Sequence, residues 1–85
     1  MVIHIPNPLR SYTSDEKVQA EGHTIAEVLK NLDAQFPGIR FRVIDEQDRI
    51  RRHIKIFLNE EMVDNLKEPI ESKDTLHIIC ALSGG

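Results

Sequence analysis

Two glycines, Gly84 and Gly85, end the chain directly after an apolar segment that alternates like a β-strand. Glycine lacks a Cβ and reaches backbone angles closed to other residues, so two in succession make a thin stalk. Such a stalk would leave the terminal carboxylate accessible as the working part of the molecule. Residues 82–85, if extended, would reach roughly 13 Å beyond a sheet. The same glycines also fit an ordinary frayed chain end.

Other chemically active side chains are few. Cys80 alternates with Leu76 and Ile78, which predicts a buried and inert thiol rather than a persulfide carrier. One cysteine forms no internal disulfide and, alone, no zinc site. Three of the four histidines fall on outward strand positions and could cluster across a sheet, but without metal-ligand spacing we expect solvated imidazoles and no metal. The four are His4, His23, His53 and His77.

The composition is typical of one small folded domain, residues 1–85. Of the 85 residues, 40% are hydrophobic and 29% are charged, and this size leaves little volume for a deep enzyme cleft. A net charge of −3 favours neither nucleic acid nor an anionic membrane as a partner. The longest apolar run, residues 78–82, is far shorter than the roughly 20 residues that span a bilayer. With the single cysteine, this predicts a cytoplasmic protein that is monomeric when isolated.

The first half of the chain predicts a hairpin and one long helix. Residues 1–5 alternate as a strand, and residues 17–20 form a second strand after the turn-like stretch SYTSDEK. Residues 24–36 carry an apolar stripe at helical spacing. Thr24 and Glu27 stand at the spacing of a capping box, in which each side chain accepts the other residue's backbone N–H.

The second half predicts further strands. Residues 39–53 show alternating apolar positions around the polar turn DEQD, and we interpret them as a charged hairpin. Residues 54–58 form a strand with Ile54, Ile56 and Leu58 inward. Residues 60–74 have room for a short strand and one helical turn, and residues 75–82 form the last strand.

The most basic stretch, RIRRHIK, could suggest RNA binding together with Arg40 and Arg42. Acidic residues lie in the same segment, however, and no aromatic run accompanies it. We therefore expect a charged hairpin that is complementary to an acidic partner surface.

This order of elements predicts an α+β fold, with a single helix across one face of a sheet. The outward strand positions on the other face should be polar, yet Phe57 and Ile79 are apolar. They indicate a docking surface, although scattered surface hydrophobic residues fit them equally well.

The chain resembles ubiquitin at its end, where DTLHIICALSGG has the T-L-H triplet, the alternating aliphatic residues and Gly-Gly. Upstream, HIKIFLNEE and LKEPIESKDTLHII resemble more closely the MoaD/ThiS family of ubiquitin-like sulfur carriers. IPNPLRSYT, FPGI and IDEQDRIRRHIKIFLN are most similar to its CysO-type branch. The resemblance implies a β-grasp fold, with a mixed sheet of four to five strands, one main helix across one face, and residues 83–85 as a flexible tail.

The same resemblance implies a chemistry for the chain end. A partner related to ubiquitin-activating enzymes, an adenylyltransferase and sulfurtransferase, would use ATP to adenylate the carboxylate of Gly85, which follows Gly84. Sulfide or a persulfide would displace AMP and leave a thiocarboxylate. A sulfur-accepting synthase in cysteine, thiamine or molybdopterin synthesis would receive the sulfur. The chain would bind no cofactor itself and would be a substrate rather than an enzyme.

These partners would recognise the folded body of the domain. The resemblance places Phe57 and Ile79 where ubiquitin has its docking patch, and we expect partner contacts at Phe57, Ile79, Ala81 and Leu82. Leu82 also fits the last position of the core. Ala81 and Ser83 replace two basic residues of ubiquitin, which argues against use of the ubiquitylation enzymes.

Three other functions fit the same features. The chain could be a protein modifier joined through Gly85 to a target lysine, or a β-grasp interaction module whose tail is idle. It could also be the small subunit of a molybdopterin synthase, where the same thiocarboxylate works within a stable complex.

Overall fold

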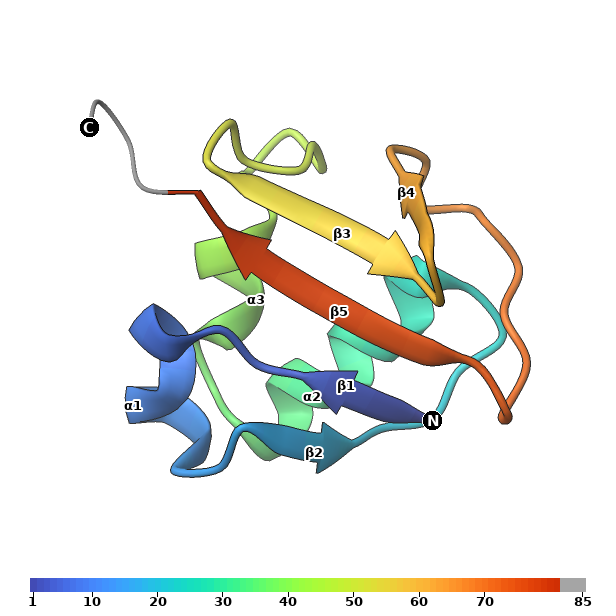
Figure 1. Cartoon of the computed structure of the whole chain (residues 1–85). Coiled ribbons are helices and arrows are strands. Elements are labelled where there is room, and N and C mark those ends of the chain that lie inside the picture. Colours follow the sequence, from blue (N-terminus) through green and yellow to red (C-terminus); the bar gives the residue numbers. More distant parts are fainter. Residues whose placement is uncertain (82–85) are drawn as a thin grey trace.

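The computed structural model describes residues 1–81, which form one mixed sheet of five strands (Figure 1). The order across the sheet is β2-β1-β5-β3-β4. β1 and β5 run parallel, whereas the other neighbouring strands run antiparallel. The last strand in sequence therefore lies in the centre of the sheet. The strands are β1 (Val2–His4), β2 (Lys17–Gln19), β3 (Ile54–Leu58), β4 (Glu61–Val63) and β5 (Thr75–Cys80).

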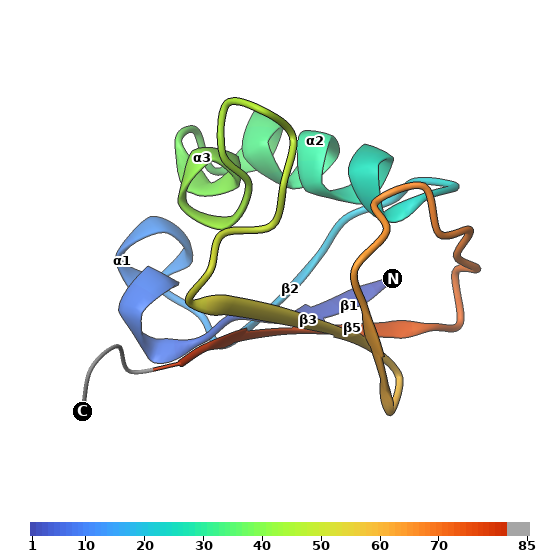
Figure 2. The ribbon, with the colours of Figure 1, turned by 90° about the horizontal axis from the view of Figure 1, so that it is seen from above.

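The helices leave one face of this sheet uncovered. The main helix α2 (Ile25–Gln35) and the short α3 (Ile39–Val43) lie across the other face (Figure 2). A 3-10 turn, η1 (Asn7–Leu9), and α1 (Arg10–Thr13) join β1 to β2 at one end of the sheet. The expected sheet, hairpin and single main helix are confirmed. None of the helices in residues 1–81 is long and apolar enough to cross a membrane.

The core lies between the sheet and α2. Inward strand positions face the apolar stripe of the helix, as the alternation of β3 and β5 and the helical spacing predict. Leu58 was expected inward but is only half-buried, because β3 ends there next to the exposed turn at Asn59. The fully buried side chains include Ile3, Ile25, Val28, Leu29, Leu32, Ile54, Ile56, Leu76 and Ile78.

The start of α2 is held by three hydrogen bonds to its first free N–H groups. Thr24 Oγ1 accepts from the N–H of Glu27 at 3.2 Å, as predicted. The reciprocal bond differs from a capping box: Glu27 Oε1 accepts from the N–H of His23, one residue before the cap. The N–H groups of Ile25 and Ala26 donate to carbonyls of the segment before β5. That segment thus caps the helix from outside.

Thr24→Ala is expected to lower the free energy of unfolding by about 1 kcal/mol, because the N–H of Glu27 loses its acceptor. In a domain of this size, the loss corresponds to a fall of about 4–8 °C in Tm. Thr24→Ser keeps the hydroxyl and is the matched control. Equal denaturation midpoints for the two variants would contradict a capping role.

Two stretches expected as turn or hairpin are short helices instead. Within SYTSDEK, α1 continues to Thr13 and ends at Ser14, whose φ is 64°. Residues 39–43 form α3, because Ile39 and Val43 are spaced for one helical face as well as for one strand face, and both are buried. The start of α3 is fixed by Asp33, whose carboxylate accepts the N–H groups of Gly38 and Arg40.

The polar turn after α3 is confirmed. Asp45 Oδ1 accepts the N–H groups of Gln47 and Arg49, and an isolated bridge pairs Ile44 with Ile50. The charged hairpin is therefore limited to residues 44–50. The segment 64–74 contains turns and a bridge from Pro69 to Thr24, and it forms no helical turn.

Candidate functional site

The uncovered face of the sheet carries a row of side chains across all five strands. The pairing register joins Lys17 to His4, His4 to His77, His77 to Phe57 and Phe57 to Met62. Directly paired residues point to the same side of a sheet, so these five side chains lie side by side. We call this set the open-face row. It is basic at the β2 edge and apolar at the β4 edge.

Ile79 extends the apolar part of this face toward the end of β5. It pairs with Lys55 on β3 and is 45% exposed. Phe57, two residues further along β3 and on the same face as Lys55, is half-buried, and Met62 is 61% exposed. The structure therefore brings Phe57 and Ile79 together on the open face, as the alternation predicts, and it adds Met62. The three-residue strand β4 gives too short a pattern for the sequence to place Met62.

The chain leaves the sheet at Ala81, which is exposed. Its N–H donates to the carbonyl of His53 at 2.7 Å, so the pairing of β5 with the β3 side continues one residue past the strand. Of the predicted site residues, Leu82, Gly84 and Gly85 lie outside the described residues, as does the predicted tail 83–85. The described part of the site is thus the open face that leads to this exit.

The histidines of the open face form one stacked pair. The rings of His4 and His77 are 4.3 Å apart between centroids and inclined by 18°. His53 does not join them, because it lies at the other end of β3. Within residues 1–81, no three His, Cys, Asp or Glu side chains gather as metal ligands would.

Partial burial lowers the pKa of His4, and the neighbouring His77 and Lys17 lower it further, against a smaller opposing effect of Glu16. The folded protein therefore favours the neutral imidazole. The unfolded chain binds a proton there at a higher pH, so stability falls as the pH drops through the ordinary histidine pKa.

His4→Gln is accordingly expected to reduce the loss of stability between about pH 7 and about pH 5. The free energy of unfolding from urea titrations at both pH values measures this. His23→Gln removes an exposed imidazole away from the pair and serves as control. If His4→Gln loses as much stability as the unsubstituted protein, His4 does not carry this pH dependence.

Cys80 is half-buried rather than buried as expected, because β5 ends beyond the cover of the core. Burial raises the pKa of its thiol, and the charge of Arg42 opposes this rise. A raised pKa disfavours the reactive thiolate. The raised pKa therefore agrees with the predicted inert thiol, but Cys80 is less deeply buried than predicted.

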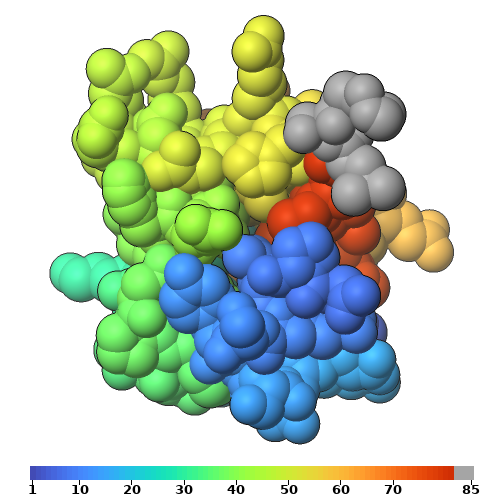
Figure 3. Space-filling model, turned by 90° about the vertical axis from the view of Figure 1, so that its left-hand side faces the viewer, coloured from blue at the N-terminus to red at the C-terminus, as the bar shows by residue number. Residues whose placement is uncertain are grey.

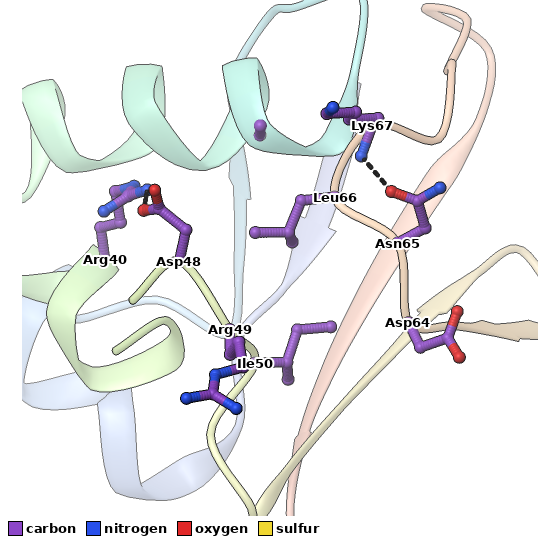
Figure 4. Close-up of a pocket in the computed structure, with 9 residues that line it drawn as sticks. Arg40, Asp48, Arg49, Ile50, Asp64, Asn65, Leu66 and Lys67 are labelled. Atoms are coloured by element: carbon purple, nitrogen blue, oxygen red, sulfur yellow. Dashed lines mark hydrogen bonds and ion pairs between the residues drawn. The ribbon is translucent and has the colours of Figure 1, made fainter. Parts of the chain in front are cut away.

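A hollow of about 720 Å³ lies on the helix side of the sheet (Figure 4). Ile50 and Leu66 point toward each other across it, and the ion pair of Arg40 with Asp48, at 3.0 Å, closes one side. Its lining holds no serine, cysteine or histidine. It offers no nucleophile with a base beside it, so the open face and the chain end remain the candidate site.

The fold and the exit of the chain beside an apolar sheet face define a β-grasp protein of the ubiquitin-like class. A sequence profile of the ThiS family matches residues 3–85, and the chain belongs to this family.

Individual relatives agree with this assignment over the full length. The sulfur carrier protein CysO of Mycobacterium tuberculosis is 32% identical over 91 residues, covering 100% of this chain and 98% of that protein. In the crystal structure of the Amycolatopsis orientalis BexX/CysO complex, one chain matches with a TM-score of 0.91 and 31% identity, covering 99% of this chain and 98% of that chain. The crystal structure of Mycobacterium tuberculosis CysO gives a TM-score of 0.89 at 30% identity, covering 95% and 98%. The predicted resemblance and fold are confirmed.

Proposed function

We propose that this chain is a sulfur carrier whose Gly85 carboxylate is adenylated by a partner enzyme and converted to a thiocarboxylate. The carboxylate oxygen attacks the α-phosphorus of ATP, and pyrophosphate leaves. Sulfide then attacks the carbonyl carbon of the acyl adenylate, AMP leaves, and a C-terminal thiocarboxylate remains. The chain is a substrate in this reaction and a cytoplasmic sulfur donor to a synthase of the cysteine, thiamine or molybdopterin type.

The observation that carries this proposal is the extent of the family match. It runs from residue 3 to residue 85, and so includes Gly84 and Gly85 together with the whole domain. Full-length relatives named as sulfur carriers support the same function. The central strand β5 leads straight to the exit at Ala81, which suits a domain that delivers its chain end to another protein.

The partner contacts follow from the same geometry. A protein that receives the chain end also meets the last part of β5, and Ile79 and Phe57 lie on its open face. Burial of exposed apolar side chains there would provide affinity, at about 25 cal/mol for each Å² removed from water. A relative named CysO occurs in a complex with BexX, which supports a stable partner for this chain as well.

Intact mass after reaction tests the proposal. The protein is incubated with the activating enzyme of the same cell, ATP and sulfide, and one oxygen should be replaced by one sulfur. A Cys80→Ser variant leaves the thiocarboxylate as the sole sulfur nucleophile outside methionine, so a single added iodoacetamide group should report it. Omission of ATP should prevent both changes.

Two results would speak against the carrier function. The first is an unchanged mass in the presence of an activating enzyme that consumes ATP on other substrates. The second is a set of conjugates linked from Gly85 to lysines of other proteins with no thiocarboxylate, which would identify a protein modifier.

A further inference from the structure

Positive charge is concentrated in one segment of an acidic protein. Residues 40–55 hold six of the eleven Lys and Arg residues but three of the fourteen Asp and Glu residues. Residues 60–74, in contrast, hold six acidic and two basic residues. These segments lie toward opposite ends of β5, and β5 runs from the acidic end toward the basic one (Figure 1). The last described residue, Ala81, therefore lies at the positive end of the molecule.

An aromatic ring and several cationic groups meet at that end. The guanidinium carbon of Arg51 lies 4.6 Å from the ring centroid of Phe41, and Arg51 Nε donates to the carbonyl of Phe41 at 2.7 Å. These two residues, Arg42 and His53 line a hollow of about 360 Å³. We call these residues, with the exposed Arg52 between Arg51 and His53, the exit surface.

The arginines of the exit surface lack ionic partners in the described part of the chain. No carboxylate in residues 1–81 lies within ion-pair distance of Arg42, Arg51 or Arg52, whereas Arg40 pairs with Asp48. Asp45 interacts with Arg51 only at longer range. Phe41 is 49% exposed although it is held in place by Arg51. Exposed aromatic and arginine side chains in fixed positions are the residue types that dominate protein interfaces.

The exit surface borders the point where the chain leaves the sheet. The carbonyl of His53 accepts the N–H of Ala81, and the charge of Arg42 acts on the thiol of Cys80. Figure 3 views this end, where the green-to-yellow atoms of residues 39–53 lie beside the red end of β5. Any protein that takes residues 82–85 into an active site must therefore face this surface.

We propose that the exit surface docks on an acidic rim around the active-site entrance of the activating enzyme, with Phe41 in an apolar recess of that rim. This inference rests on the proposed function. It separates two tasks: the open face of the sheet provides apolar contact area, and the exit surface orients the approach so that the chain end arrives first. Charges at an interface rim act mainly on the association rate and its salt dependence.

Steady-state adenylation, followed as pyrophosphate release, tests the role of the charges. Arg42→Glu/Arg52→Glu is compared with Lys30→Glu/Lys67→Glu, which makes the same change in net charge at exposed positions elsewhere. At low salt, kcat/KM of the first variant should fall at least about tenfold with kcat preserved, and the control should stay within about threefold of the unsubstituted protein. Added NaCl should lower kcat/KM of the unsubstituted protein and hardly affect the first variant.

Phe41→Ala should raise KM about tenfold at every salt concentration.

Three outcomes would overturn the inference. Equal kcat/KM for the two charge-reversal variants would show that the position of the charges does not matter. Unchanged kcat/KM in Arg42→Glu/Arg52→Glu together with lost binding to an RNA oligonucleotide would assign the surface to nucleic acid. If Tm of that variant falls, Arg42→Gln/Arg52→Gln replaces it, and an undiminished kcat/KM of this second variant at unchanged Tm would assign the first effect to folding. Absence of adenylation in the unsubstituted protein would instead count against the proposed function.

Discussion

Removal of Gly85 alone is expected to lower thiocarboxylate formation by about 100-fold or more while the fold stays intact. The shortened chain still ends in a glycine carboxylate, but the reactive group lies one residue, about 3.3 Å, nearer the sheet. A displacement of 1 Å from the reactive position can already cost about 100-fold in rate. The strands, helices and core of residues 1–81 do not include the deleted residue, so Tm should not change.

The matched control keeps the length and changes a neighbouring side chain. Ser83→Ala leaves the carboxylate at Gly85 and should react within about threefold of the unsubstituted protein. Both variants are assayed by intact mass after incubation with the activating enzyme, ATP and sulfide. Normal thiocarboxylate formation on the chain that ends at Gly84 would show that the distance of the carboxylate from the sheet does not matter. The carboxylate of Gly85 would then not be required for the reaction.

Ile79→Asp is expected to raise KM for activation by about 30-fold or more and to change kcat little. In the free protein the new carboxylate faces solvent and stands opposite Lys55, an arrangement that a sheet tolerates well. In the complex it would be buried against an apolar partner surface without a matching charge, and such losses commonly exceed about 2 kcal/mol.

Ala34→Asp provides the comparison, because it adds the same charge at an exposed position of α2 on the other side of the sheet. Its KM should match that of the unsubstituted protein. Similar KM values for both variants would remove the open face from the partner interface. Thermal denaturation of each variant separates this result from a loss of folding.

The long elements could be predicted because the apolar residues of each follow a single spacing, either helical or alternating. In α2 four apolar positions repeat at helical spacing, and in β3 three residues alternate, so burial of one face decides the structure. Residues 39–43 could not be assigned in this way, since Ile39 and Val43 satisfy both periods over five residues. The carboxylate of Asp33, which belongs to the preceding helix, determines the outcome. Local sequence alone does not contain that contact.

The sequence predicts on which face of the sheet each site residue lies, but not which residues lie next to one another. Alternation places His77 and Phe57 on the outward side of their strands, and the structure agrees. It does not give the register, so the contact of His4 with His77 requires the parallel pairing of the first and last strands. The exit surface likewise joins α3 to the segment before β3, and the sequence shows its arginines and Phe41 but not the contact between Arg51 and the Phe41 ring.

The central position of β5 has a consequence for the synthesis of the protein. β1 and β3 both pair with this strand, yet it follows the other four strands in sequence. The sheet can therefore close only after residues 75–80 have been translated, and such long-range pairing is slow relative to helix formation. A chain that still lacks β5 would expose the unpaired edges of β1 and β3, and such edges invite proteolysis and aggregation. Strand order thus acts as a check during biogenesis: the five-stranded sheet forms only when its last strand has been made.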